Sequence, residues 1–292
     1  MIIELKKNTD SATIQKMALR LNAFHIRNHD KNLLITSASV KALESDLETH
    51  VENQWVFAND MQLSSRSFLN ETREIKLKEG LSIGGKHNNT LLIGGPCSVE
   101  SEDQIRSASA LLKELDLSVL RGGCYKPRTS PYSFQGLGLE GLQLLSKMRE
   151  DFGHLIISEV RDATHVEAII EHTDIIQIGA KAMYDQGILK ACAKTQKPVM
   201  IKRGFGSTLQ EFTQAAEFIL AGGNSNVILC ERGIRTFETK TRFTLDLCGV
   251  AWLQEHTNLP IILDPSHAMG YAYGVPSLTR ACMAMKVEGL II

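Results

Sequence analysis

The sequence predicts an α/β protein, a (β/α)8 TIM barrel preceded by a small α+β unit, from three observations. Between residues 76 and 292, short apolar runs alternate with amphipathic stretches of helical length. There are eight such runs, the number of parallel strands that closes a barrel. None is followed by the GxGxxG or GxxxxGK[ST] pattern that binds phosphate in many open α/β sheets. The alternative, an open doubly wound sheet, is therefore less favoured.

Residues 1–60 predict a βαββαβ unit of the ferredoxin-like kind. Its expected elements are a strand over 1–7, a helix capped by Asp10, a hairpin over 24–38, a helix from Ser39 to Leu47, and a strand over 51–58. The unit contains no catalytic constellation.

Residues 61–75 are polar and aperiodic, which predicts a linker between the two units. A hairpin is expected next, over residues 73–85. The barrel domain then occupies 76–292, with strands expected over 90–95, 118–123, 155–160, 174–180, 198–204, 226–233, 260–267 and 288–292. The given sequence stops within the eighth strand, so the expectation is a C-terminally truncated barrel that lacks its eighth helix.

Composition excludes several classes of function. The formal net charge is −1, which gives no electrostatic support for binding nucleic acid or a membrane surface. No apolar run approaches the about 18 residues that a membrane span requires. The six cysteines form no CxxC pair, a usage that favours reduced thiols and a cytoplasmic protein.

Charged residues gather where the predicted strands end. The cations among them are Arg121, Lys126, Arg128, Lys181, Lys202, Arg203, Arg232 and Arg235. The carboxyl ends of barrel strands form the active site, so these side chains should meet there and repel one another. Arginine and lysine bind phosphate and carboxylate groups, which would compensate the repulsion. The pattern thus predicts one or two small substrates that carry phosphate and carboxylate.

Six motifs, in this order, also carry a resemblance: GGPCSVES, LRGGCYKPRTSPYSFQG, QIGA, IKRG, ILCERGIRTFE and ILDPSH. Together they resemble the 3-deoxy-D-arabino-heptulosonate 7-phosphate (DAHP) synthases, in the branch with a small N-terminal regulatory domain. The resemblance is strong over residues 60–292 and rests on topology and position for the first unit.

The resemblance implies condensation of phosphoenolpyruvate with erythrose 4-phosphate on a barrel, the first step of the shikimate pathway to aromatic amino acids. It implies a divalent metal, which in such enzymes is Mn, Fe, Zn or Co. It also implies a homo-oligomer, commonly a tetramer, and feedback inhibition by tyrosine or phenylalanine.

The resemblance also implies roles for individual residues. Those matching the phosphoenolpyruvate ligands are Arg121, Lys126, Lys202, Arg232 and Lys181, the last standing where the family has arginine. Those matching the sugar-phosphate pocket are Arg128, Thr129 and Ser130, and those matching acidic residues of the site are Glu159 and Asp264. Cys97 and His267 match two of four metal ligands. Lys126 is the candidate proton donor.

Two other functions remain open. A truncated, inactive relative could bind ligands or pair with an intact subunit, because the remaining two metal ligands are not found in the sequence. The related 3-deoxy-manno-octulosonate 8-phosphate synthases share the GPC and ERG motifs. They lack KPRTS, so Arg128 and Thr129 favour the shorter sugar phosphate.

Overall fold

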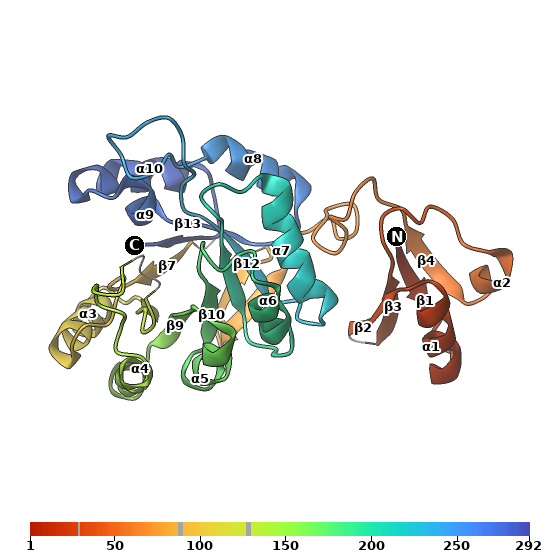
Figure 1. Cartoon of the computed structure of the whole chain (residues 1–292), viewed down its shortest axis with the longest axis horizontal. Helices are drawn as coiled ribbons and strands as arrows, with labels where there is room; N and C mark the ends of the chain where they lie inside the picture. The colour runs from red at the N-terminus through yellow and green to blue at the C-terminus, as the bar shows by residue number, and fades with distance from the viewer. Residues whose placement is uncertain (29, 87–89, 127–129) are drawn as a thin grey trace.

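The computed structural model describes residues 1–28, 30–86, 90–126 and 130–292, which form a barrel and a smaller sheet unit at one end of it (Figure 1). Arg128 and Thr129 of the predicted sugar-phosphate pocket lie outside the described residues. The barrel strands are β7 (Leu91–Gly94), β8 (Val119–Arg121), β9 (Leu155–Val160), β10 (Ile175–Ile178), β11 (Val199–Lys202), β12 (Val227–Glu231), β13 (Ile261–Leu263) and β14 (Gly289–Ile291).

The eight strands close a parallel barrel in the order β10-β11-β12-β13-β14-β7-β8-β9. Closure is completed where β14 pairs with β7, in the register Leu290 to Leu92. The predicted barrel is confirmed, and the open-sheet alternative is wrong.

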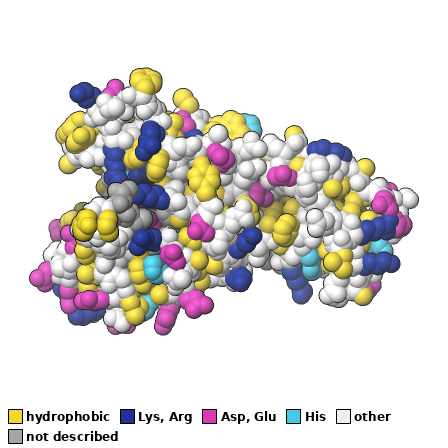
Figure 2. Space-filling model, viewed as in Figure 1, with side chains coloured by type: hydrophobic (Ala, Val, Ile, Leu, Met, Phe, Trp, Pro, Cys, Tyr) yellow, Lys and Arg dark blue, Asp and Glu magenta, His cyan; other side chains and the backbone are white. Residues whose placement is uncertain are grey.

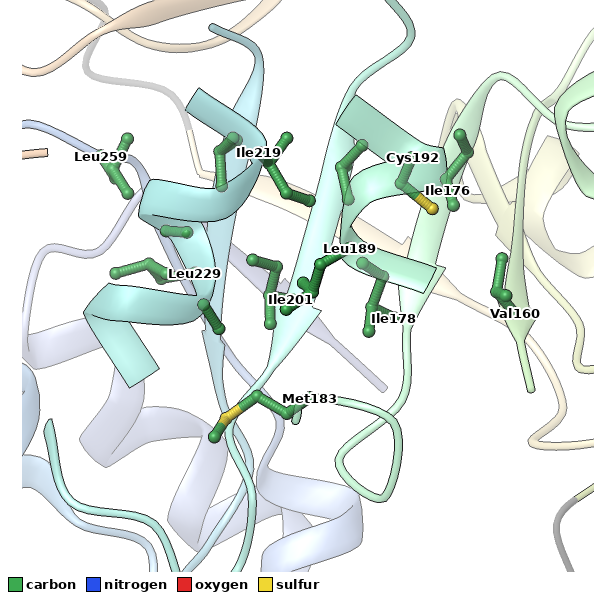
Figure 3. Packing of buried hydrophobic residues seen from close by; sticks show 14 of the residues in the cluster. Val160, Ile176, Ile178, Met183, Leu189, Cys192, Ile201, Ile219, Leu229 and Leu259 are labelled. Atoms are coloured by element: carbon green, nitrogen blue, oxygen red, sulfur yellow. The ribbon is translucent and has the colours of Figure 1, made fainter. Parts of the chain in front are cut away.

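Helices follow the strands and cover the outside of the barrel. They are α3 (Glu102–Glu114), α4 (Leu139–Phe152), α5 (Val166–His172), α6 (Gln186–Ala193), α7 (Leu209–Ala221), α8 (Leu247–His256), α9 (Pro265–Met269) and α10 (Val275–Ala284). The 3₁₀ turns η1 (Ala163–His165) and η2 (Ala272–Gly274) precede α5 and α10. Apolar side chains fill the layer between strands and helices; Figure 3 shows Ile178 of β10 and Ile201 of β11 beside Leu189 of α6.

A hairpin formed by β5 (Glu74–Lys78) and β6 (Leu81–Gly84) closes the amino-terminal end of the barrel. Its Ile75 and Ile83 are buried in a cluster with Leu91, Val119 and Ile175, which lie at or near the starts of their strands. The carboxyl ends of the strands are therefore left for the loops, where a barrel carries its active site.

The first unit is an antiparallel sheet of order β2-β3-β1-β4. Its elements are β1 (Ile2–Leu5), α1 (Ser11–Arg20), β2 (Phe24–Asn28), β3 (Lys31–Ile35), α2 (Ser45–Glu48) and β4 (Val51–Trp55). The elements follow one another in the predicted βαββαβ order, and the side chain of Asp10 caps α1 as expected.

The predicted helix from Ser39 to Leu47 is wrong. Only the single turn α2 is helical, and it begins at Ser45. The hydroxyl and the N–H of Ser39 both donate to the Ser37 hydroxyl, and the Ala38 N–H donates to Asp60. Local side-chain bonds of this kind compete with helical hydrogen bonds, so they hold the start of the segment in another conformation.

The connecting segment is bonded to both units. Glu217 of α7 accepts from the N–H groups of Gln62, Leu63 and Ser64 at 2.8, 3.2 and 2.8 Å, and from the Ser64 hydroxyl at 2.6 Å. On its other side Gln62 accepts from the amino group of Met1 at 2.7 Å. The predicted linker is thus buried over residues 62–65 and attached to α7. In the part of the chain that the structure describes, no helix has the length and apolar character to cross a membrane.

Candidate active site

Side chains from several strands meet at the carboxyl end of the barrel, around a cavity of about 20 Å³. Five of the predicted site residues line it: Cys97, Arg121, Glu159, Lys202 and His267. Lys126 and Asp264 bond directly to members of this group. In the face shown in Figure 2, Lys and Arg side chains gather in a hollow on the barrel side of the molecule. Topology therefore brings together seven residues that are far apart in sequence.

Cys97 and His267 form the centre of the site. The Cys97 Sγ lies 3.3 Å from the His267 Nε2. The other ring nitrogen, Nδ1, lies 2.7 Å from the Asp264 Oδ2, and the Asp264 Oδ1 accepts from the His267 backbone N–H at 2.9 Å. Asp264 thus caps α9 and orients the imidazole in one arrangement, with Nδ1–H on the carboxylate and Nε2 toward the sulfur.

Lys126 lies on the other side of the cysteine. Its Nζ donates to the Cys97 carbonyl oxygen at 2.7 Å and to the Sγ at 3.2 Å. The hydrogen bond with His267 lowers the pKa of the Cys97 thiol to about 6; burial opposes this shift, and the Lys126 charge strengthens it. The lowered pKa favours the thiolate form of Cys97, the form that binds a metal or acts as a nucleophile.

Asp264 is fully buried and pairs with Lys202, whose Nζ lies 2.6 Å from the Oδ2. Burial alone would raise the pKa of Asp264. The Lys202 ammonium, the hydrogen bond from His267 and the Arg121 charge outweigh burial and hold the pKa well below its ordinary value. Arg121 is itself held by a 2.8 Å bond from its Nε to the Gly95 carbonyl.

Glu159, at the end of β9, accepts a 2.6 Å hydrogen bond from the Gln177 amide of β10. A Cβ at Gly179 would lie 2.3 Å from the Glu159 Oε1, so the absence of a side chain there leaves room for the carboxylate. Gln177 also lines the cavity, and it was not among the predicted site residues. Its signal in the sequence was a single polar residue within the otherwise apolar strand IIQI.

Two arginines at neighbouring strand ends have different environments. Arg232 stacks on the Phe243 ring at 4.3 Å, and its Nη1 is buried with no hydrogen-bond partner among the described residues. Arg203 instead pairs with Glu231 at 2.9 Å and Asp246 at 2.8 Å. A buried donor without a partner marks a place for an acceptor from a ligand. Glu231 and Asp246 compensate the charge of Arg203 within the protein, although its Nε, like the Arg232 Nη1, is buried without a hydrogen-bond partner among the described residues.

The remaining predicted residues lie away from this centre. Lys181 is exposed on the turn that follows β10 and lies outside the cavity lining. Ser130 is half-buried; its hydroxyl accepts from the Tyr132 N–H and its carbonyl accepts from the Gln135 amide. Arg235 is exposed and stacks on Phe205 at 4.8 Å.

The structure offers two adjacent donors to a metal, the Cys97 sulfur and the His267 Nε2. Within the described ranges, no group of three or more His, Cys, Asp or Glu side chains is arranged to hold an ion. Glu231 is taken up by Arg203 and by the Gly233 N–H. A sulfur and an imidazole suit a transition metal, but catalytic sites typically use about three protein ligands.

Comparisons with known proteins agree with this picture. Residues 72–292 match the sequence model of the DAHP synthetase I family. The whole chain is 37% identical to the phospho-2-dehydro-3-deoxyheptonate aldolase of Thermotoga maritima and covers 88% of that protein. A 2-dehydro-3-deoxyphosphooctonate aldolase of Magnetococcus marinus is 33% identical over 71% of this chain and 78% of its own length.

Solved structures are similar over most or all of the chain. The crystal structure of a Thermotoga maritima DAHP synthase has a TM-score of 0.78 and 36% identity, covering 100% of this chain and 87% of that chain. A truncated form of the Thermotoga maritima enzyme has a TM-score of 0.73 and 40% identity, covering 79% of this chain and 83% of that chain.

Proposed function

The chain belongs to the DAHP synthetase I family, and on this premise we propose that it condenses phosphoenolpyruvate with erythrose 4-phosphate to give DAHP and phosphate. The observation that carries the proposal is the set of cations around Cys97 and His267, with the buried Nη1 of Arg232 left for a ligand acceptor. The inactive-subunit alternative is not supported by the comparisons. The octulosonate alternative is weaker, because the relatives of that name align with a smaller share of the chain.

Phosphoenolpyruvate would bind through Arg121, Lys126, Lys202 and Arg232. Lys126 and Lys202 are engaged with Cys97 and Asp264, and the cavity of about 20 Å³ has room for about one water. Binding therefore requires both ammonium groups to turn toward the incoming phosphate and carboxylate. The anionic groups of the ligand would then compensate the two ammonium charges, and Asp264 would keep its hydrogen bonds from His267.

The reaction needs a carbon–carbon bond and a proton. The C3 of phosphoenolpyruvate attacks the aldehyde carbon of the sugar. The aldehyde oxygen becomes an alkoxide that must be protonated. Lys126, bonded at the edge of the cavity, is placed to donate that proton. Water then adds at the C2 and the C2–O bond to phosphate breaks, so that the ketone of the product forms. Asp264 holds His267 in place throughout.

Cys97 and His267 would supply two ligands to a divalent ion such as Mn, Fe, Zn or Co. When bound, such an ion supplies Lewis-acid polarisation of the aldehyde oxygen. The described residues provide these two donors side by side, with Asp264 as the outer partner that orients the imidazole.

The sugar phosphate is assigned to Arg128, Thr129 and Ser130 on the resemblance of the KPRTS motif, and Lys181 to the phosphoenolpyruvate phosphate on the same ground. We assign residues 76–292 to catalysis, 61–75 to a connection and 1–60 to feedback control by tyrosine or phenylalanine. A homo-oligomer, in this family commonly a tetramer, and a cytoplasmic location complete the proposal. The reduced cysteines support the location.

The decisive experiment measures phosphate release by the purified chain with each substrate alone and with both. It is repeated with added manganese and with a chelator, and with arabinose 5-phosphate in place of erythrose 4-phosphate. We expect release only with both substrates, loss of activity with chelator, and preference for the four-carbon sugar. Absence of metal-dependent release would refute the proposal, and preference for arabinose 5-phosphate would replace it with the octulosonate reaction.

A further inference from the structure

The guanidinium of Arg232 is held by an aromatic ring. Its central carbon lies 4.3 Å from the centre of the Phe243 ring, and Arg232 itself is only 5% exposed. Among the described residues, no carboxylate forms an ion pair with Arg232. Arginine stacks on aromatic faces, and this attraction is stronger when the pair is removed from water. Phe243 therefore stabilises the cation without neutralising it.

Two other buried cations at neighbouring strand ends are held differently, by carboxylates. Lys202 pairs with Asp264 at 2.6 Å, and Arg203 pairs with Glu231 at 2.9 Å. The protein itself compensates these two charges. An aromatic ring attracts a cation through its quadrupole but carries no net charge. A guanidinium that stacks on a ring therefore keeps its full positive charge for an anionic ligand.

The position of Phe243 is fixed by contacts with several parts of the barrel. Its ring stacks on Phe205, in the loop after β11, with 5.6 Å between the ring centroids. Its backbone N–H donates to the carbonyl of Ala268 in α9 at 2.9 Å. The next residue, Thr244, pairs with Ile234 in an antiparallel bridge within the loop after β12. The ring is thus held by two loops and a helix at the carboxyl end of the barrel.

Gly233 makes the close approach of Phe243 possible. A Cβ at Gly233 would lie 2.6 Å from the Phe243 Cβ, which is closer than two carbon atoms can come without displacement. The φ of Gly233 is +96°, a value that also favours glycine. The residue that follows Arg232 in the chain therefore leaves space for the ring on which Arg232 stacks.

We propose that Phe243 is a positioning residue for phosphoenolpyruvate, whose ring keeps the Arg232 guanidinium available to the ligand and away from nearby carboxylates. The negative charges of Asp264 and Glu231 act on this guanidinium. Without the ring, Arg232 would turn toward these carboxylates, and the phosphate or carboxylate of the ligand would have to displace them. The inference rests on the proposed function, because it takes Arg232 as a ligand of phosphoenolpyruvate.

The test measures phosphoenolpyruvate binding to the full chain by calorimetry, with manganese and without the sugar phosphate, and then the KM of each substrate. The variants are Phe243→Leu, which keeps an apolar side chain but removes the ring, and Phe243→Tyr, which keeps the ring. The matched control is Phe237→Leu, the same substitution in the same loop, at a side chain that is 98% exposed. Circular dichroism checks that each variant is folded.

We expect Phe243→Leu to weaken phosphoenolpyruvate binding about 5- to 30-fold, the loss typical of a desolvated cation–aromatic contact. The KM for phosphoenolpyruvate should rise by a similar factor while the KM for erythrose 4-phosphate changes little, and Phe243→Tyr and Phe237→Leu should bind as the parental chain does. Equal binding by the two leucine variants, a loss that Phe243→Tyr shares, or no binding by the parental chain would overturn the inference. Binding without turnover by the parental chain would refute the catalytic proposal instead, and the binding comparison would then decide the inference alone.

Discussion

Replacing Asp264 by asparagine should destabilise the barrel strongly, because it removes the negative partner of a buried ion pair. The Asp264 Oδ2 lies 2.6 Å from the Lys202 Nζ, and both side chains are almost fully buried. At an effective dielectric constant near 20, two unit charges at that distance attract with about 6 kcal/mol. The asparagine oxygen retains a weaker bond to the ammonium. The expected loss in the free energy of unfolding is therefore about 3–5 kcal/mol, typical of a buried pair that loses one partner.

The matched control is Asp46→Asn, which breaks an ion pair of the same length, 2.6 Å to Arg20, on the exposed surface of the first unit. Water screens that pair, so the control should lose little stability. Urea unfolding followed by fluorescence and circular dichroism gives both values. Equal losses in the two variants would refute the reasoning, because they would mean that burial does not decide the strength of the Lys202 interaction.

The same residue sets a pH dependence. The pKa of Asp264 is well below its ordinary value in the folded chain and near 4 in the unfolded chain. In acid the unfolded state therefore binds more protons, and stability falls with decreasing pH. The contribution is complete above about pH 4 and is lost as the pH falls through the folded pKa. Asp264→Asn should therefore flatten the stability profile on the acid side of pH 4.

Three further outcomes are expected. In metal-free protein, the rate of Cys97 alkylation by iodoacetamide should rise with pH, with a midpoint near pH 6. His267→Ala should move that midpoint upward, because it removes the largest cause of the low pKa. An unchanged midpoint would contradict the assigned hydrogen bond. Gly179→Ala should reduce turnover at least about 10-fold with little change in stability, because the new Cβ displaces the Glu159 carboxylate. Full activity would show that catalysis does not require the Glu159 carboxylate in this position. Glu217→Gln should speed proteolytic cleavage at residues 62–64, because the segment loses one acceptor oxygen and the negative charge of the carboxylate. Cleavage at the parental rate would show that packing alone holds the segment.

Much of the barrel was predictable because its information is local. Each strand is a short apolar run, and the alternation with amphipathic helices dictates a parallel sheet whose carboxyl ends share one face. That topology turned scattered positions such as Cys97, Asp264 and His267 into a predicted cluster. The helix expected to begin at Ser39 failed for a local reason and a non-local one. Ser39 binds the Ser37 hydroxyl, and the Ala38 N–H binds Asp60 from another part of the chain.

The sequence predicted where the charged residues of the site lie, but it did not predict which groups they interact with. Arg203 and Arg232 follow the same rule in the sequence, as cations at strand ends. Only the structure shows that Glu231 and Asp246 pair with Arg203, whereas among the described residues no carboxylate pairs with Arg232. Gln177 was missed because a single amide in an apolar strand carries no charge pattern, and its role depends on Glu159 of the neighbouring strand.

The hairpin of β5 and β6 closes one end of the barrel, so that only the carboxyl end gives access to the site. Its Ile75 and Ile83 close the amino-terminal end with apolar side chains, so both substrates must arrive, and both products must leave, through the loops at the carboxyl end. Substrate entry and product release then use the same opening. A product that dissociates slowly therefore blocks binding of the next substrate. The order in which phosphate and DAHP dissociate thereby affects the rate of turnover.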